Sequence, residues 1–387
     1  MDVYYLQLRK KMLTNKETKD KFFGEGIFDI RMFSSSGIGS YIRNLIKFGI
    51  LVQISELLVN KEIDILIKKE KAIIINSKSY SIAEQFILPI KIPSSKLFFS
   101  PHYNIPLLPT RAKKRLVTIH DVFHLAFFHS LSFRQKIYAK LMINAAVRLS
   151  DQIITVSEFS KSELSKYTGV SPDKINVIYN GVDFSQFKKI DNSDIKNQII
   201  HKYQLPNNFL LYVGNVKPHK NLIGLIEAYN FSKKIKSSFH LVIVGKKEGF
   251  ITSDNEIDQL IKRYQLEDKI LFTGYVEEVD LTPIYNLASW FIFPSLYEGF
   301  GLPPLEAMAC GTPVVASDIP VFHEIYDNAF VPVNTTIPKL FASTLEKALF
   351  NNDLKESLIL KGLIQCKKYT WEKSAQKHIE LIQKMIS

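Results

Sequence analysis

Two glutamates separated by glycine-rich backbone are the residues best suited to chemistry in this chain of 387 residues. The stretch Glu-Gly-Phe-Gly-Leu-Pro-Pro-Leu-Glu begins at Glu298 and ends at Glu306, eight residues later. It follows a short apolar run that is expected to form a buried strand ending at Phe293. A helix is expected to begin near Pro303, because proline is tolerated in a first helical turn.

Such a loop can hold two parts of one ligand. Carboxylates accept paired hydrogen bonds from neighbouring hydroxyl groups, and backbone amides before a helix bind phosphate. Glu298 and Glu306 are therefore expected to grip hydroxyl-rich groups while the amides between them hold a phosphate. A plainer explanation is that Glu306 lies in the first turn of the helix, where the helix dipole favours it. That explanation leaves Glu298 and its loop without a role.

Lys220 stands at a second place where a strand is expected to meet a helix. Residues 210–214 are predicted to be a strand that ends in Gly214. Asn215 then opens the loop Asn-Val-Lys-Pro-His-Lys-Asn, which leads into a helix over residues 222–229. Lys220 would lie at the start of that helix beside free amides, a combination that suits a diphosphate. A solvated lysine would explain the residue as well.

The first half of the chain offers a glycine loop and a histidine. Gly37 and Gly39 lie in a loop of small residues that runs into a helix, where backbone can approach a phosphate. The third glycine of a dinucleotide fingerprint is missing, because Ile42 stands in its place. His120 directly follows the expected strand 115–119, and a histidine there can donate a hydrogen bond to a sugar hydroxyl or a phosphate. A tight turn and a loop-stabilising histidine are the plainer alternatives.

Short apolar runs alternate with longer amphipathic segments along most of the chain, which predicts strands followed by crossover helices and hence the α/β class. Helices in the first half are expected over residues 40–48 and 133–149. Strands are expected over residues 26–30, 71–75, 96–99, 115–119, 152–156 and 175–178, and then over 209–213, 240–244, 270–273, 290–293 and 313–316.

The pattern restarts after a polar stretch around residues 180–192, which predicts two doubly wound, Rossmann-like domains joined by a linker. We expect a first domain over residues 1–185 and a second over 186–365. The C-terminal segment, 366–387, is expected to hold a helix that packs back on the first domain. Ligands of such sheets bind at the carboxyl ends of the strands, so two facing domains would form a cleft. The first 24 residues carry no informative pattern.

Composition limits the compartment and the cofactors. The two cysteines do not form a disulfide framework, and no spacing typical of a metal site occurs. The beginning of the chain does not resemble a signal peptide, and no apolar run is long enough to span a bilayer. A cytoplasmic protein is therefore expected.

The net charge of +12 is concentrated in the first half of the chain. Residues 1–183 hold 27 Lys and Arg against 16 Asp and Glu, whereas residues 184–387 hold 23 against 22. Such an excess indicates an anionic partner, and we expect peripheral contact with an anionic membrane face. Scattered solvated lysines are the plainer alternative. A nucleic-acid partner is not expected, because aromatic stacking platforms among the basic residues are not apparent.

The two-glutamate stretch lies in a longer pattern, Glu-Gly-Phe-Gly-Leu-Pro-x-Leu-Glu-Ala-Met-Ala-x-Gly-x-Pro-Val, which resembles the large retaining glycosyltransferase family 4 with its GT-B fold. Shorter matches lie at Gly37–Gly39, Thr118–Asp121, Val156–Ser160, Tyr179–Asp183, Gly214–Asn221 and around Trp371. The Asn-Val-Lys-Pro-His-Lys-Asn loop is similar to that of mannosyltransferase-like members.

The resemblance implies a role for each candidate residue. Glu298 would bind hydroxyls of a donor sugar that His120 also touches, and Glu306 would bind the ribose of its nucleotide. Lys220 would neutralise the diphosphate. The backbone of the donor site would be supplied by Gly37, Gly39, Gly214, Phe300, Gly301 and Leu302.

One position departs from the family pattern. Many members carry an arginine after the glycine that Gly214 matches, whereas Asn215 stands here. Asn215 would still belong to the donor site, but Lys220 would then carry more of the leaving-group charge, unless Lys217 or His219 contributes.

The implied reaction is retaining transfer of a hexose, with mannose favoured, from a nucleotide-diphosphate sugar to a glycan or lipid-diphosphate-linked acceptor in surface polysaccharide or lipopolysaccharide synthesis. Fixed positive charge at the leaving diphosphate would be the catalyst, so no metal or cofactor is expected. A nucleotide-sugar epimerase is one alternative, and it would turn over its substrate without an acceptor. A non-catalytic α/β nucleotide-binding protein is another, and it would not need the two glutamates and the lysine.

Overall fold

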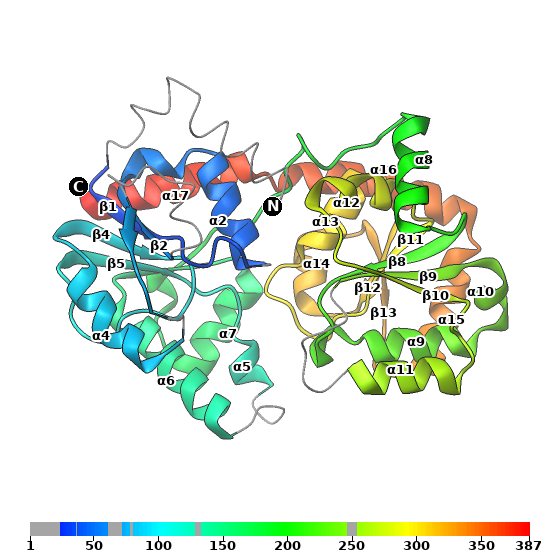
Figure 1. Cartoon of the computed structure of the whole chain (residues 1–387), viewed down its shortest axis with the longest axis horizontal. Coiled ribbons are helices and arrows are strands. Elements are labelled where there is room, and N and C mark those ends of the chain that lie inside the picture. The colour runs from blue at the N-terminus through cyan, green and yellow to red at the C-terminus, as the bar shows by residue number, and fades with distance from the viewer. Residues whose placement is uncertain (1–23, 36, 61–71, 78–79, 128–132, 246–253) are drawn as a thin grey trace. The chain divides into compact units, whose positions relative to one another are not determined.

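The computed structural model describes residues 24–35, 37–60, 72–77, 80–127, 133–245 and 254–387. They form two compact units (Figure 1). The first contains the described residues up to Gly181 together with Trp371–Ser387, and the second is Val182–Thr370. Apart from Gly24, the N-terminal segment that the sequence left uninterpreted lies outside the described residues.

The described part of the first unit contains a sheet of seven parallel strands in the order β3-β2-β1-β4-β5-β6-β7. Because β1 and β4 are neighbours, the order reverses between them, and the carboxyl ends of these two strands are where such sheets usually bind ligands. The strands are β1 (Gly26–Asp29), β2 (Ile54–Val59), β3 (Ala72–Ile74), β4 (Ser95–Ser100), β5 (Ala112–Thr118), β6 (Gln152–Thr155) and β7 (Ile175–Val177).

Helices cover both faces of this sheet. They are α2 (Ile38–Lys47), η2 (Ile50–Gln53), α4 (Ile82–Lys91), α5 (Phe123–Ala126), α6 (Phe133–Leu149), α7 (Glu158–Thr168), η5 (Pro172–Lys174) and α17 (Trp371–Ile386). Figure 1 shows α2 and α17 on one face and α4, α6 and α7 on the other. The C-terminal helix α17 contacts α2 and β4 and buries Trp371, Ala375 and Ile382.

The described part of the second unit contains six parallel strands in the order β10-β9-β8-β11-β12-β13. They are β8 (Phe209–Val213), β9 (His240–Val244), β10 (Ile270–Gly274), β11 (Trp290–Phe293), β12 (Val314–Ser317) and β13 (Phe330–Val333). The helices are α8 (Ser193–Tyr203), η6 (Pro218–Lys220), α9 (Leu222–Phe231), α10 (Lys233–Ser238), α11 (Asp254–Arg263), α12 (Glu278–Leu287), α13 (Leu302–Ala309), α14 (Pro320–Tyr326), α15 (Pro338–Leu349), α16 (Asn352–Gln365) and η7 (Cys366–Lys368). The expected α/β class with two doubly wound parallel sheets is confirmed.

Two strands are absent from the sequence-based expectation. Strand β2 belongs to a nearly continuous apolar run after a helix, where periodicity does not separate helix from strand. Strand β13 contains Pro332, which lowers any strand prediction, and the structure explains its presence because β13 is the edge of the sheet.

Candidate functional site

The loop between β11 and α13 turns sharply at Gly301. This residue caps the start of α13 with φ +89°, a left-handed conformation that favours glycine. Its carbonyl accepts a hydrogen bond of 2.7 Å from the hydroxyl of Tyr326. A β-carbon at this position would lie 2.1 Å from the same hydroxyl oxygen. Both the backbone angle and the close approach of Tyr326 therefore require glycine here.

We expect Gly301→Ala to lower the free energy of unfolding by about 2 kcal/mol or more, because the backbone strain and the contact with Tyr326 add. Chemical denaturation monitored by circular dichroism would measure this loss. Adding Tyr326→Phe to the variant should restore part of it by removing the clashing oxygen. A stable Gly301→Ala protein would contradict the assigned turn.

Lys220 and Glu298 form an ion pair between the Nζ atom of the lysine and Oε1 of the glutamate. The two side chains are 20% and 13% exposed, so a ligand can still reach both. The lysine Nζ also lies 5.6 Å from the ring centroid of Phe293, over its face. The pair joins the loops that follow β8 and β11, which are neighbours in the sheet. The sequence predicted both residues as site residues but did not predict that they pair.

The two loops are also joined through their backbones. Lys220 ends the short helix η6, and α9 begins at Leu222 after Asn221, whose backbone is left-handed. The amide of Leu296 donates a hydrogen bond of 2.8 Å to the carbonyl of His219. The Asn221 side-chain amide donates to the carbonyl of Thr335 at 2.9 Å. The first of these bonds holds the lysine against the loop that carries Glu298, and the second ties the start of α9 to the segment that follows β13.

Glu306 lies in the second turn of α13, because the helix begins at Leu302. The expectation of a glutamate in the first turn, favoured by the helix dipole, is therefore wrong. Its partner is the hydroxyl of Tyr285 on α12, which donates to Oε2 at 3.0 Å. Burial raises the pKa of Glu306 to about 7, although this hydrogen bond acts in the opposite direction. The sequence carries no local signal for Tyr285.

The remaining predicted residues of the second unit follow β8 and β11. The side chain of Phe300 is buried, with its ring 5.7 Å from that of Tyr369. Leu302 is the first residue of α13. The amide of Gly214 already donates to the carbonyl of Val244 at 3.0 Å. The carbonyl of Asn215 accepts a hydrogen bond of 3.3 Å from the hydroxyl of Tyr212.

In the first unit, Gly37 and Gly39 open α2. Gly37 caps the helix with φ +36°. The amide of Gly39 donates to Oγ of Ser35 at 3.1 Å, and a β-carbon on Gly39 would lie 2.5 Å from the carbonyl oxygen of Phe33. Close packing of its own loop therefore explains Gly39 without a ligand.

His120 follows β5 with its Nε2 atom 2.9 Å from the carbonyl oxygen of Pro101. A carbonyl only accepts hydrogen bonds, so Nε2 carries the proton and Nδ1 is the acceptor of the neutral ring. Burial lowers the pKa of His120, which favours this neutral form. Because the Nε2 proton is directed at Pro101, His120 can offer a ligand an acceptor at Nδ1 and not the donor that was expected.

A buried network connects α17 to the neighbourhood of His120. His378 lies with Nδ1 2.7 Å from the carbonyl of Ser374 and Nε2 2.6 Å from the hydroxyl of Tyr41, which is 2.9 Å from Oγ1 of Thr118. The ring of Tyr41 meets that of His120 edge to face at 4.8 Å. Tyr41 and His378 are 337 residues apart, so local sequence patterns do not reveal their contact.

Acidification is expected to destabilise the protein through His378. Burial lowers the pKa of this histidine from 6.5 to about 4. Between these values the unfolded chain binds more protons than the folded one, so stability falls as the pH falls through the window, by at most about 1.4 kcal/mol per pH unit. Denaturation at a series of pH values would measure the slope, and His378→Gln should reduce it. If the free energy of unfolding depends on pH in the same way in the variant, a group other than His378 causes the effect.

A second buried polar cluster lies beyond β1 and β4. Arg31 donates from Nε to Oδ1 of Asp29 at 2.9 Å, and its Nη1 lies 2.6 Å from Oε1 of Glu84. Asn104 donates to Oε2 of Glu84 at 2.8 Å, and Asn104 also accepts from the hydroxyl of Tyr138 at 2.8 Å. All three charged groups are almost completely buried. These residues are not predicted from the sequence as site residues, although Asp29 is the last residue of β1 and Arg31 follows it by two positions.

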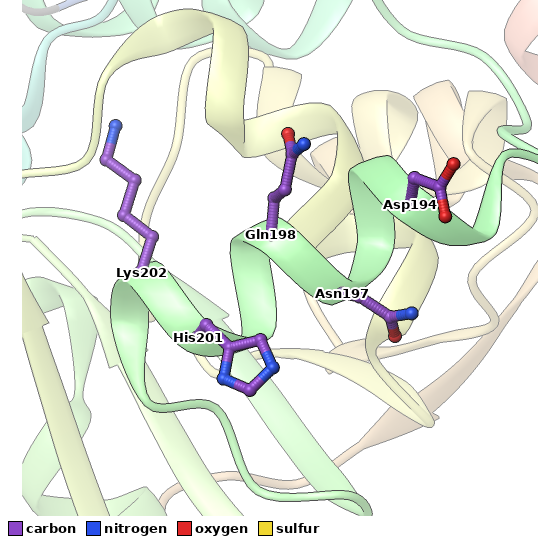
Figure 2. A pocket seen from close by; sticks show the side chains of 5 residues that line it. All are labelled: Asp194, Asn197, Gln198, His201 and Lys202. Carbon is purple, nitrogen blue, oxygen red and sulfur yellow. The ribbon is translucent and has the colours of Figure 1, made fainter.

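A surface hollow on α8 does not contain any of the candidate residues. Figure 2 shows its lining side chains along this one helix: Asp194, Asn197, Gln198, His201 and Lys202. The Lys202 ammonium pairs at 2.7 Å with Asp280 of α12. The hollow is therefore not part of the candidate site.

Comparison with known proteins connects this geometry to a family. The family model described as glycosyl transferases group 1 matches residues 195–362, and that described as glycosyltransferase family 4 matches residues 97–186. The O-antigen chain mannosyltransferase RfbU of Salmonella typhimurium is 35% identical over 258 residues, which are 66% of this chain and 66% of that protein. O-antigen chain mannosyltransferase B of Escherichia coli is 29% identical over 270 residues, 68% of this chain and 69% of that protein.

The fold is also similar to that of solved structures. The solved structure of sucrose-phosphate synthase from Thermosynechococcus elongatus matches with a TM-score of 0.77 at 18% identity, covering 93% of this chain and 99% of that one. The two mannosyltransferases align with this chain over about two thirds of their length. With a glycosyltransferase family match in each unit and these relatives, the chain belongs to glycosyltransferase family 4 and has the GT-B fold.

Proposed function

We propose that the protein transfers a hexose, with mannose as the first choice, from a nucleoside-diphosphate sugar to a glycan or lipid-linked acceptor. The reaction would serve the synthesis of a surface polysaccharide such as the O antigen of lipopolysaccharide. The observation that carries the proposal is the Lys220–Glu298 pair, held between the loops that follow two neighbouring strands. The choice of mannose rests on the O-antigen mannosyltransferases similar to this chain.

The paired side chains would separate when the donor binds. The diphosphate would take over Lys220, and the released carboxylate of Glu298 would accept hydrogen bonds from the sugar hydroxyls. Negative charge grows on the diphosphate as the glycosidic bond breaks, so the lysine and the amides around Gly301 would bind the transition state more tightly than the ground state. This step would need neither a metal nor a cofactor.

Two further residues would position the donor. Glu306 would accept hydrogen bonds from the ribose, with Tyr285 orienting its carboxylate. His120, from the first unit, would accept a hydrogen bond from a sugar hydroxyl at Nδ1, because its Nε2 proton is held by Pro101. Gly37, Gly39, Gly214 and Asn215 would shape the surrounding backbone.

We also propose that the protein works in the cytoplasm, at the inner face of the cell membrane, and does not bind nucleic acid. The basic excess of residues 1–183 supports contact with anionic lipid. A bilayer-spanning helix, which has to be both long and apolar, does not occur among the residues that the structure describes.

Thermal unfolding with GDP-mannose, UDP-glucose and ADP-glucose tests the donor. A ligand that binds only the folded chain stabilises it by about 2.7 kcal/mol at a hundred times its dissociation constant. We expect GDP-mannose to raise the unfolding temperature most. Stabilisation by none of the three would contradict the proposal. Conversion of GDP-mannose to an epimer without acceptor would favour the epimerase alternative.

A further inference from the structure

The outer face of α4 is apolar where a helix that covers a sheet normally presents polar side chains. Ile82, Phe86 and Ile90 follow one another at four-residue spacing and are 82%, 59% and 73% exposed. Glu84, on the opposite face of the same helix, is completely buried. The helix thus exposes three large apolar side chains while it buries a glutamate, which departs from the usual amphipathic pattern.

Buried ionic contacts hold α4 in this orientation. Oε1 of Glu84 pairs with Arg31 at 2.6 Å, and Oε2 accepts hydrogen bonds from the amide of Tyr80 at 2.7 Å and from Asn104 at 2.8 Å. Leu88, one turn further along the same face, packs into the core. Turning the helix to bury Phe86 would leave Arg31 buried without this partner, which is strongly destabilising. The exposed apolar side chains are therefore a stable feature of the fold.

Helix α6 extends the same surface. Ile137 and Leu141 lie one turn apart and are both 52% exposed. Figure 1 shows α4 and α6 on the same face of the sheet, and the rings of Tyr80 and Tyr138 connect them with centroids 6.4 Å apart. We call this surface the α4–α6 face. It consists of Ile82, Phe86, Ile90, Lys91, Ile137, Lys140, Leu141 and Arg148.

The chain segment that carries this face is basic. Residues 80–149 contain ten Lys and Arg against two Asp and Glu, and one of the two acids is the buried Glu84. Helix α6 has no acidic residue along its length, and Lys140 and Arg148 are exposed on it. Exposed apolar side chains accompanied by the exposed cations Lys91, Lys140 and Arg148 match the surface of a bilayer that contains anionic lipids.

We infer that the α4–α6 face lies in the headgroup region of an anionic bilayer, with Phe86 and its apolar neighbours reaching the upper acyl chains and Lys91, Lys140 and Arg148 meeting the lipid phosphates. This deepens the proposed membrane contact and rests on it. It gives the first unit a defined docking surface, on which a lipid-linked acceptor would reach the protein without leaving the membrane.

A tryptophan introduced on the α4–α6 face allows its insertion into the bilayer to be measured by fluorescence. Trp290 and Trp371 are 1% and 2% exposed, so they supply a constant background. With vesicles of three parts phosphatidylcholine to one part phosphatidylglycerol, the added fluorescence of Phe86→Trp should shift to the blue and be quenched by brominated lipid. Leu360→Trp is the matched control, because Leu360 is an exposed apolar residue on α16 of the second unit, 64% exposed. Equal quenching of both, or of neither, would overturn the inference.

Loss of the apolar contact should weaken binding. The double variant Phe86→Ser, Ile90→Ser is expected to lower the vesicle partition coefficient about tenfold or more, since two large side chains lose their burial. The matched pair Leu360→Ser, Ile364→Ser, which is equally exposed on α16, should leave it unchanged. Lys140→Glu with Arg148→Glu should also weaken binding, and neutral phosphatidylcholine vesicles should bind less than the anionic ones.

Two controls separate the explanations. Light scattering after gel filtration gives the oligomeric state, and a dimer that dissociates in the Phe86→Ser, Ile90→Ser variant would assign the face to a second copy of the chain. Stabilisation by GDP-mannose should be the same in this variant as in the wild type, which also shows that it is folded. A protein that binds vesicles through this face without stabilisation by any nucleotide sugar would contradict the proposed function and leave the docking surface standing.

Discussion

Replacing Lys220 by alanine is expected to lower kcat/KM for sugar transfer by about 10²- to 10³-fold, the loss typical when one fixed group that stabilises transition-state charge is removed. Lys220 is the cation that the structure holds beside Glu298, and the expected arginine is replaced by Asn215. Because charge on the diphosphate grows as the bond breaks, the loss should fall on kcat as well as on KM.

Steady-state release of the nucleoside diphosphate would measure this effect, with circular dichroism to show that the variant is folded. Lys217→Ala is the matched control, since Lys217 is an exposed lysine of the same loop and should tolerate the change. If Lys220 only holds Glu298 in place, Lys220→Ala and Glu298→Gln should lower kcat/KM by the same factor. The double variant should then lose no more activity than either single variant. Turnover close to that of the wild type in Lys220→Ala would contradict the assigned role.

Glu306→Gln is expected to weaken donor binding by about 10- to 100-fold, because hydrogen bonds to a charged group contribute about 1.5–3 kcal/mol. Burial raises the pKa of this carboxyl to about 7, so in the wild type the binding form is lost as the pH falls through that value. Calorimetric titration with GDP-mannose on both sides of this pKa would show affinity rising with pH. The glutamine variant should lack this dependence.

The stability of the free protein should respond to Glu306 with the opposite sign. The folded carboxyl holds its proton more tightly than the unfolded one, with a pKa of about 7 against 4.5. Its contribution to stability is therefore lost as the pH rises through this window.

Tyr285→Phe removes the hydrogen bond that lowers the pKa of Glu306, so the midpoint of the change in donor affinity should move to higher pH. A pH dependence that persists in Glu306→Gln would assign it to another group.

Local sequence patterns predicted most of the fold. Strands β8, β9 and β11 and helix α6 lie over the residues expected. Their apolar patterns indicate the type of each element, and the turn residues beside them indicate where it begins and ends. Strands β2 and β13 depend on their tertiary surroundings instead. The apolar sequence of β2 is compatible with either a helix or a strand. Strand β13 tolerates Pro332 only because it lies at the edge of the sheet.

The sequence by itself determined which residues could form the site. Lys220, Glu298 and Glu306 each belong to a strand–turn–helix segment, and the residues close to them in the sequence are enough to predict that segment. It also determined that the first half of the chain is basic. What these residues contact was decided only by the tertiary structure. Lys220 meets Glu298, 78 residues away, because β8 and β11 are adjacent in the sheet, and Tyr285 reaches Glu306 because α12 contacts α13.

The same division holds for the first unit. The proton position on His120 follows from the carbonyl of Pro101, and the outward apolar face of α4 follows from the burial of Glu84 against Arg31. Periodicity in the sequence shows that a helix has two faces, but the partner available inside the fold decides which face is buried. Strand order and buried charge pairing are long-range properties, so they become visible only when the chain is folded.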